Sequence, residues 1–547
     1  MAGVSFNKAY LERLLRFKID DKKLAFEITK MGIELKGINE DSIEVDITPN
    51  RPDLLDAVGF ARSVRHFMHK AKPINYSLNA EDADMLIDVG AGVKKVRPFI
   101  AGLVAKGVSL DDSSLEALLN FTDKLSETYG RKRSKLAIGI HNLNALKPPI
   151  LYDTFGDEAF VPLEYKEEMK YSRLIEIDSR GRDYKYTIKG AIAKGMFPVL
   201  KDAGGVLALI PIINSERTKI SESTKNLFID ITGTNKYIVE KIADMLACMF
   251  IDMDGDVKKV AVRYDEGIVK TPVMAEKNLS IDLIKIEEQI GIAIGFNNVI
   301  SLANKMGYNA KLIGKKINFS LPKYRLDIIS EQDVIEDMAI AYGYEYIREM
   351  PLYASQPGSL EADTNVDRLV SRLLVGLGFT EEANSYLVNE EQNFTKMRLS
   401  VPKKDEYIRI LDSKTHNITM LRTWLLTSLM KNLAISAQDS MPQKIFEADL
   451  SFVINNGKAE ERRGVAGAWA DPKANFNDMK AIVYALLKGI GIPDFETREF
   501  SHNSFIDGRC AAIFHKKKRI GFFGEIHPEV LYNFGIEEST FAFELDL

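Results

Sequence analysis

An internal repeat restricts the fold more than any other feature of this sequence. Residues 22–68 and 297–344 follow one plan: a helical pattern ends in Lys-Met-Gly, two strand-like segments follow, and a proline-containing corner opens another helix. Gly32 and Gly307 close the two helical patterns, as glycine commonly does at a helix end. The segments IELKGI and SIEVDI correspond to YNAKLI and KINFSL, and the alternation in SIEVDI is typical of a half-buried strand. The repeat predicts two small α+β modules of winged-helix type.

The strand-to-helix corner has the same chemistry in both copies. Each corner carries a proline, an arginine and an aspartate: Pro49, Arg51 and Asp53 in the first copy, and Pro322, Arg325 and Asp327 in the second. Because the arrangement occurs twice, we interpret it as structural. We expect the aspartate to cap the helix start and the arginine to pair with the aspartate.

An acidic trio distinguishes the second copy from the first. Asp333, Glu336 and Asp337 are spaced i, i+3, i+4, so they share one helical face. Three carboxylates on one face repel each other unless a cation or a basic partner lies there, and Asp327 could add a fourth oxygen ligand. Oxygen-only ligation suits a hard cation such as Mg²⁺. The alternative is an ordinary solvated acidic face.

The length of the chain predicts several domains. A chain of 547 residues exceeds what one hydrophobic core normally supports. We expect an α+β multidomain protein in which the first repeat copy forms an N-terminal module and the second copy a separate one. The expected boundaries are 1–85 for the first module, 86–268 for a mixed α and β region, 269–350 for the second module and 360–547 for a C-terminal α+β domain.

Composition excludes several classes of protein. Cys248 and Cys510 stand far apart without neighbouring histidines or cysteines, which argues against a disulfide framework or a thiolate zinc site. No apolar run is long enough to span a membrane, and the amphipathic start MAGVSFNKAYLERLLRF lacks the apolar core of a signal peptide. We therefore expect a soluble, cytoplasmic protein.

The net charge of −5 gives no overall attraction to nucleic acid, so RNA contacts would depend on local basic patches. Two such patches occur, at residues 131–135 (RKRSK) and 515–519 (HKKKR). The second lies between strand-like segments, and we expect a solvated hairpin turn. The first precedes the strand-like LAIGI, and here an RNA contact and a solvated turn remain open.

A polar loop in the middle region separates two apolar segments, VLALIPII and LFIDI. It contains Asn214, Ser215 and Glu216, followed by Arg217 and Thr218. Such a loop could bind a small polar molecule or orient a water molecule. The pattern by itself favours a simpler interpretation, a hairpin with a hydrophilic tip.

In the C-terminal region a helix with an apolar stripe precedes several strand-like segments, which suggests an α+β domain. The stripe comprises Val366, Leu369, Val370, Leu373, Leu374 and Leu377. We expect it to serve as core or as a subunit interface.

These segments together resemble the β subunit of phenylalanyl-tRNA synthetase, in its archaeal and eukaryotic cytosolic form. The similar motifs are ITPNRPDLLDAVGFAR, YRLDIISEQDVIEDMAIAYGYEYI, IPIINSERTKISESTKNLFIDITGT, LRTWLLTSLMKNLA and QKIFEADLSF. The resemblance implies an α2β2 heterotetramer with an α subunit that binds ATP and phenylalanine and aminoacylates tRNA(Phe). It places Asp327, Asp333, Glu336 and Asp337 at the positions of magnesium ligands, in an ion site shared with the α subunit.

The resemblance also assigns roles to the other domains. It implies that the C-terminal domain is a catalytically inactive relative of the class II synthetase domain, and the strand Ile445-Phe446-Glu447-Ala448 indeed lacks the arginine that holds the ATP α-phosphate in class II enzymes. It implies that the middle region is an editing domain that hydrolyses Tyr-tRNA(Phe). Residues expected to contribute there are Asn214, Ser215, Glu216, Thr232 and His141.

Two other hypotheses stay open. The chain could be a non-catalytic tRNA-binding or scaffold protein built from synthetase modules. It could also be a stand-alone aminoacyl-tRNA deacylase, which would act without a partner subunit.

Overall fold

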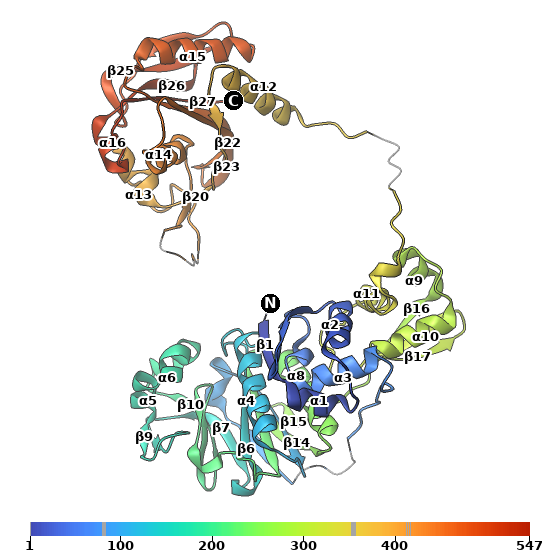
Figure 1. Cartoon of the computed structure of the whole chain (residues 1–547). Coiled ribbons are helices and arrows are strands. Elements are labelled where there is room, and N and C mark those ends of the chain that lie inside the picture. The colour runs from blue at the N-terminus through green and yellow to red at the C-terminus, as the bar shows by residue number, and fades with distance from the viewer. Residues whose placement is uncertain are drawn as a thin grey trace. The chain divides into compact units, whose positions relative to one another are not determined.

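The computed structural model describes residues 2–78, 82, 84–351, 357–411, 413, 415 and 417–547. The chain divides into two compact units, Met1–Pro351 and Leu352–Leu547 (Figure 1). Within the described residues, no helix is both long and apolar enough to cross a membrane. Each unit is described by itself below.

Both repeat copies fold into the same module, which confirms the repeat and extends it toward the N-terminus. Each has the order β-α-α-β-β-α and a three-stranded antiparallel sheet in which the third strand lies in the middle. The first module consists of β1 (Ala2–Asn7), α1 (Lys8–Leu15), α2 (Asp21–Lys30), β2 (Glu34–Ile38), β3 (Ser42–Ile47) and α3 (Ala57–Phe67). The second consists of β16 (Asn278–Asp282), α9 (Leu283–Ile290), α10 (Phe296–Lys305), β17 (Asn309–Ile313), β18 (Lys316–Ser320) and α11 (Glu331–Tyr342).

The Lys-Met-Gly sequences end α2 and α10 as predicted. Gly32 and Gly307 have φ angles of +76° and +83°, in the left-handed region that glycine enters without steric cost. The two modules also lie against each other, because α3 of the first contacts α10 of the second.

The middle domain is built on a ten-stranded mixed sheet. Its order is β12-β11-β10-β7-β4-β14-β5-β13-β6, with β15 paired to β14. The strands are β4 (Leu86–Val89), β5 (Phe99–Lys106), β6 (Leu136–Asn142), β7 (Ile150–Phe155), β10 (Phe197–Asp202), β11 (Gly205–Leu209), β12 (Ile213–Asn214), β13 (Leu227–Gly233), β14 (Asp256–Tyr264) and β15 (Gly267–Thr271). Since β15 runs to Thr271, the sheet continues past the expected boundary at residue 268.

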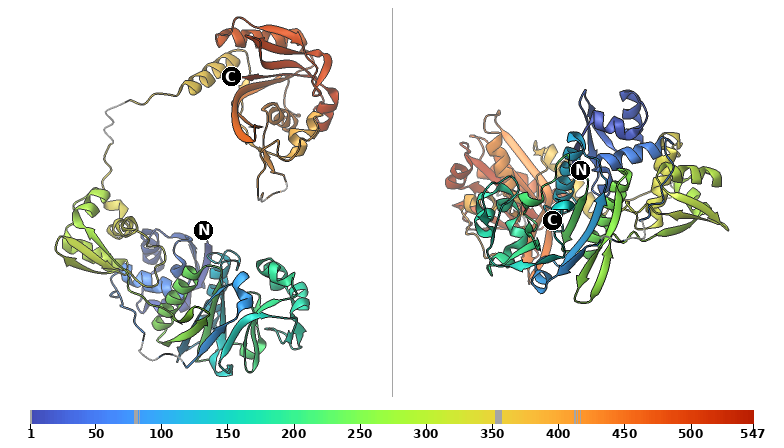
Figure 2. Two further views of the ribbon diagram at one scale, coloured as in Figure 1. Left: turned by 180° about the vertical axis from the view of Figure 1, so that it is seen from behind. Right: turned by 90° about the horizontal axis from the view of Figure 1, so that it is seen from below.

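Helices cover this sheet. The long helices α4 (Asp112–Glu127) and α8 (Lys236–Asp252) bury apolar residues against β5, β6 and β13. The segment after β7 forms a smaller lobe (Figure 2). That lobe contains β8 (Ala159–Phe160), β9 (Met169–Lys170), α5 (Tyr171–Ile177), α6 (Ser179–Tyr184) and α7 (Lys189–Ile192).

The hairpin expected around Asn214–Thr218 is wrong. β11 pairs with β10 and β12, whereas β13 pairs with β5 and β6. The polar loop therefore connects strands that lie near opposite ends of the sheet order. All seven residues of β13 are buried, so this strand needs neighbours on both sides, and the sequence pattern does not reveal which strands these are.

The C-terminal unit has a seven-stranded sheet in the order β19-β22-β23-β27-β26-β25-β24, antiparallel except for the β19–β22 pair. Its strands are β19 (Thr380–Glu381), β22 (Gln443–Asn455), β23 (Lys458–Ala470), β24 (Glu496–Glu499), β25 (Phe505–His515), β26 (Lys518–Ile526) and β27 (Thr540–Asp546). The short strands β20 (Leu387–Val388) and β21 (Met420–Leu421) pair separately, beside α13 (Glu390–Asn393). The expected α+β domain of helix and antiparallel strands is confirmed.

Two apolar clusters cover the faces of this sheet. α12 (Ala362–Gly376) and α15 (Phe476–Gly489) belong to one, and α14 (Leu426–Ile435) and α16 (Pro528–Phe534) to the other. Only part of the α12 stripe enters the core: Val370 and Leu374 are buried, whereas Val366 and Leu369 are 38% and 41% exposed. The basic segment 515–519 is a two-residue hairpin turn between β25 and β26, as expected.

Candidate functional site

The sheet of the middle domain curls until its two terminal strands approach each other. Asn214, on β12, donates from Nδ2 to the carbonyl oxygen of Ile140, on β6, over 3.3 Å. Arg133 donates from Nη1 to the carbonyl oxygens of Pro211 at 3.1 Å and Ile212 at 2.9 Å. Side chains thus close the seam where a backbone ladder would otherwise continue.

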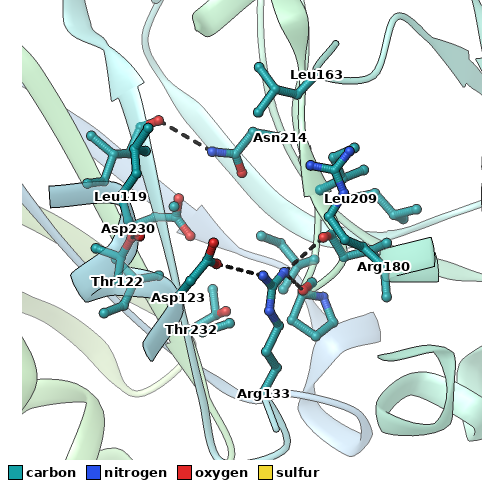
Figure 3. Close-up of a pocket in the computed structure, with 18 of the residues that line it drawn as sticks. Leu119, Thr122, Asp123, Arg133, Leu163, Arg180, Leu209, Asn214, Asp230 and Thr232 are labelled. Carbon is teal, nitrogen blue, oxygen red and sulfur yellow. Dashed lines mark hydrogen bonds and ion pairs between the residues drawn. The ribbon is translucent and has the colours of Figure 1, made fainter. Parts of the chain in front are cut away.

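A cavity of about 220 Å³ lies at this seam (Figure 3). Its lining is mainly apolar and comes from α4, β6, β13 and the segment between β11 and β12; the apolar residues include Leu119, Ala137, Ile140, Leu163, Leu209 and Ile213. Polar groups reach it from Asn214, Asp230 and Thr232. An apolar cavity with a few convergent polar groups is the usual form of a small-ligand site.

Asp230 is the most unusual residue of this cavity. It lies in the middle of β13 and is 1% exposed. Its Oδ2 is 3.0 Å from Nε2 of His141, and Nδ1 of His141 is 2.7 Å from Oγ1 of Thr218. Its Oδ1 is buried without a hydrogen-bond partner among the described residues. A buried carboxylate oxygen without a partner is costly, and a ligand that donates a hydrogen bond would remove that cost.

Gly139 makes room for Asp230. The two residues face each other across β6 and β13, and a Cβ atom at Gly139 would lie 2.1 Å from Oδ2 of Asp230. Any side chain at this position would displace the carboxylate.

Thr232 is held by a buried arginine. Arg97 is 1% exposed and donates from Nε to Oγ1 of Thr232 at 3.0 Å and from Nη2 to its carbonyl oxygen at 2.7 Å. Burial lowers the pKa of Arg97 to about 10. Because Oγ1 of Thr232 accepts from Arg97, the hydroxyl proton of Thr232 remains available to donate to a ligand.

The structure separates the five residues expected at an editing site. Asn214 and Thr232 line the cavity, and His141 lies behind Asp230. Ser215 donates to the carbonyl oxygen of Val161 at 3.2 Å, and Glu216 accepts the backbone N–H of Glu164 at 2.7 Å. Neither Ser215 nor Glu216 is among the residues that line the cavity.

Asp230 was not among the residues singled out from the sequence. The signal was its position within the apolar strand LFIDI, where a charge is expensive unless it has a partner or a function.

The two strand-to-helix corners have the same ion pair. Nε and Nη2 of Arg51 donate to Asp53 at 2.9 and 2.9 Å, and the same atoms of Arg325 donate to Asp327 at 2.8 and 2.7 Å. The predicted pairing is confirmed. The predicted capping is wrong, because α3 is capped by Asp56, whose Oδ2 accepts the N–H of Gly59 at 2.9 Å. A 3-10 turn at Pro52–Leu54 delays the helix start, and Arg51 already occupies both oxygens of Asp53.

The four carboxylates expected to bind magnesium have separate partners. Arg325 lies 2.8 Å from Oδ2 of Asp337, which also accepts the hydroxyl of Tyr308. Asp333 accepts the N–H groups of Ile329 at 2.8 Å and Ser330 at 2.7 Å in a capping box. These contacts lower the pKa of Asp333 although burial acts in the opposite direction.

Glu336 is exposed, and no group of three or more Asp, Glu, His or Cys side chains in the described ranges is placed to hold a metal ion. Arg325 supplies the positive charge for Asp327 and Asp337. The quartet therefore does not fit a single cation site formed by this chain's own residues in this arrangement.

Comparisons with known proteins agree across the chain. Residues 83–249 match the model of the B3/4 domain, residues 279–344 that of the tRNA synthetase B5 domain, and residues 348–547 that of the phenylalanyl tRNA synthetase beta chain CLM domain. Phenylalanine–tRNA ligase beta subunits are 35% identical in Methanocaldococcus jannaschii, over 100% of both chains, and 33% identical in Archaeoglobus fulgidus, over 98% of this chain and 96% of the relative. The chain belongs to the phenylalanine–tRNA ligase beta-subunit family.

A solved structure supports the fold of the first unit. The crystal structure of an N-terminal fragment of the phenylalanyl-tRNA synthetase beta subunit from Pyrococcus horikoshii is 30% identical, with a TM-score of 0.60, and covers 62% of this chain and 100% of the fragment.

Family membership also fits the chemistry of the C-terminal unit. Arg422 is fully buried; it donates from Nη1 to Glu447 at 2.8 Å and from Nε to the carbonyl oxygen of Leu450 at 3.0 Å. Asn384 donates its backbone N–H to the same carboxylate at 3.1 Å. This arginine is therefore engaged inside the domain, and the strand around Glu447 carries no arginine of its own to hold a phosphate.

Proposed function

We propose that this chain is a beta subunit of phenylalanine–tRNA ligase and that the seam cavity hydrolyses tyrosine misattached to tRNA(Phe). The free Oδ1 of Asp230 is the observation that carries the second part. Full-length similarity to beta subunits of this ligase supports the first.

The cavity suits a tyrosyl group in both shape and polarity. Its apolar walls can bury an aromatic ring, and Oδ1 of Asp230 can accept the phenolic hydroxyl. A phenylalanyl ring would displace water and leave this oxygen unpaired. A site that hydrogen-bonds a substrate hydroxyl rejects the analogue that lacks it by roughly 10⁴- to 10⁵-fold.

His141 orients this acceptor. Its Nε2 is assigned as the donor to Oδ2 of Asp230, and its Nδ1 then accepts the hydroxyl of Thr218. Thr232, whose hydroxyl proton is free of Arg97, is suited to donate to the ester carbonyl.

The assembly follows from the family. We propose an α subunit that carries the ATP and phenylalanine sites, an α2β2 heterotetramer, tRNA(Phe) as the nucleic-acid partner, and a cytoplasmic location. Magnesium at Asp327, Asp333, Glu336 and Asp337 stays a prediction for the assembled enzyme. Glu336, being exposed, is the residue of the four that a partner subunit could reach without breaking an internal contact.

A pair of glycine variants tests the hydrolytic function. In the reconstituted α–β complex, Gly139→Ala should sharply reduce hydrolysis of Tyr-tRNA(Phe), because its Cβ would collide with Asp230. Gly190→Ala, where nothing lies within 4 Å of the added Cβ, should leave hydrolysis unchanged. Aminoacylation should be normal in both. A wild-type complex that leaves Tyr-tRNA(Phe) intact would refute the proposal, and efficient hydrolysis by this chain without an α subunit would favour the stand-alone deacylase.

A further inference from the structure

A left-handed turn joins α4 to β6 beside the cavity. Arg131, Lys132 and Arg133 have φ angles of 49°, 50° and 60°, which is uncommon for residues other than glycine and is maintained only when the surroundings require it. The backbone N–H groups of these residues are already bonded, to Thr128, Glu127 and Ser126 respectively. The turn can therefore offer only side chains to a ligand.

The turn sends its three cationic side chains to different places. Arg133 lies inward, where Nη2 donates to Asp123 at 2.9 Å and Nη1 donates to the seam carbonyls. Arg131 and Lys132 are exposed. Within the described part of the chain, neither of their side chains forms an ion pair. The two charges without a partner thus sit directly beside the residue that forms the cavity wall.

Two tyrosines hold the turn in this shape. The guanidinium carbon of Arg133 lies 4.3 Å from the ring centroid of Tyr184. The hydroxyl of Tyr186 donates to the carbonyl oxygen of Lys132 at 2.8 Å, while the residue remains 50% exposed. An aromatic ring is thereby fixed at the surface beside Arg131 and Lys132.

We propose that Arg131, Lys132 and the ring of Tyr186 bind the single-stranded end of the RNA whose aminoacyl group enters the cavity. This inference rests on the proposed hydrolytic function. A nucleotide chain that ends in the cavity must carry its last phosphates past the cavity rim, where Arg131 and Lys132 stand. Basic side chains that follow the backbone, combined with an aromatic ring on which a base can stack, are the usual elements of single-strand binding.

Charge supports this occupant over a protein. The chain has a net charge of −5, so an RNA cannot be drawn in by the overall field and needs local cations. Of the two interpretations that the sequence left open for residues 131–135, an RNA contact and a solvated turn, the arrangement of these side chains favours the RNA contact.

The chain contains a matched control. Lys516 and Lys517 are also exposed cations in the left-handed region, with φ angles of 48° and 69°. They form the hairpin turn between β25 and β26 in the C-terminal unit, and no residue of that turn lines the cavity. Replacing them removes the same charge from the same backbone conformation at a different place.

The test compares Arg131→Gln/Lys132→Gln with Lys516→Gln/Lys517→Gln in the α–β complex without ATP. Hydrolysis of Tyr-tRNA(Phe) is followed at several KCl concentrations. We expect the first variant to raise KM with kcat unchanged. It should also flatten the plot of log(kcat/KM) against log[KCl] by about 1.4, because each phosphate of a single strand that is no longer neutralised changes the slope by about 0.7. The control should keep the wild-type slope. Tyr186→Ala should raise KM, and Tyr186→Phe should raise it much less because the ring is retained.

An unchanged slope and KM in the first variant, with active wild-type enzyme, would overturn the RNA surface and leave the hydrolytic function intact. If the wild-type complex does not hydrolyse Tyr-tRNA(Phe), the hydrolytic function fails instead. The Kd of deacylated tRNA(Phe) against salt then tests the surface: a slope flattened by the first variant supports it, and an unaltered slope overturns it. Normal aminoacylation by each variant complex shows that the variants are folded.

Discussion

Nε2 of His141 lies 3.0 Å from Oδ2 of Asp230, and this contact determines which oxygen of the carboxylate remains for a ligand. His141 is itself fully buried and held by Thr218. Its effect on a ligand therefore passes through the orientation of Asp230.

His141→Ala should consequently impair hydrolysis without touching the substrate. The carboxylate would lose its fixed orientation and a hydrogen bond worth about 1–3 kcal/mol in a buried site, so kcat/KM for Tyr-tRNA(Phe) should fall by roughly 10- to 100-fold. His141→Gln, which can still donate to Oδ2, should retain more activity. Deacylation assays on the α–β complex check this, and wild-type rates in His141→Ala would show that the histidine has no positioning role.

The duplicated corner ion pairs offer an internal comparison of stability. Asp53→Asn and Asp327→Asn each remove a charge from a buried pair, whose disruption typically costs about 3–5 kcal/mol. Both changes should loosen their own module to a similar extent, which hydrogen exchange of residues 2–67 and 278–342 can measure separately. A loss of protection by one variant that the other does not match would show that the two corners are not equivalent.

Removal of magnesium gives a further prediction for the same region. Because Arg325 neutralises Asp327 and Asp337, the unfolding midpoint of this chain alone should be the same in EDTA and in millimolar Mg²⁺. A midpoint that rises with Mg²⁺ in the wild type and not in Asp327→Asn would contradict this expectation and restore the four carboxylates as a cation site within one chain.

Glu544 should make the stability of the C-terminal unit depend on pH. Burial raises its pKa to about 7, although the carboxylate accepts the N–H groups of Leu425 at 3.2 Å and Leu426 at 3.0 Å. The folded pKa exceeds the unfolded value, so ionisation opposes folding. The penalty is complete above pH 7 and disappears below about pH 4.5, and it amounts to about 3 kcal/mol.

Tryptophan fluorescence can follow this effect, because both tryptophans, Trp424 and Trp469, lie in the C-terminal unit. Urea unfolding should show the wild type gaining stability relative to Glu544→Gln as the pH falls from 8 to 5. The exposed Glu461→Gln should behave like the wild type. A wild type that loses stability relative to Glu544→Gln on acidification would show that the sign is wrong.

The sequence predicted elements better than it predicted their partners. The Lys-Met-Gly helix ends and the alternating strand SIEVDI revealed the repeat, since both are local signals. The first strand and helix of each copy were missed: Ala2–Asn7 and Lys8–Leu15, and Asn278–Asp282 and Leu283–Ile290. These pieces are too short for periodicity to define. Strand pairing in the middle domain depends on contacts between distant segments, and the hairpin expected at Asn214 was wrong for that reason.

The site shows the same division. Asn214 and Thr232 were predicted and line the cavity, whereas Asp230 was missed. Its importance depends on register: Gly139 stands opposite it on β6, and His141 reaches it from the same strand. No local pattern encodes a cross-strand partner. An aspartate within a fully buried strand is nevertheless a signal of function, because burial of a charge is costly wherever it has no partner.

Discrimination between Tyr-tRNA(Phe) and Phe-tRNA(Phe) tests the role of Asp230 most directly. The ratio of their hydrolysis rates should be compared in wild-type and Asp230→Ala α–β complexes that aminoacylate normally. We predict a wild-type preference for tyrosine of at least about 10²-fold, and a ratio close to one when the acceptor oxygen is gone. A preference for tyrosine that survives Asp230→Ala would contradict the assignment of Asp230 as the group that recognises the hydroxyl.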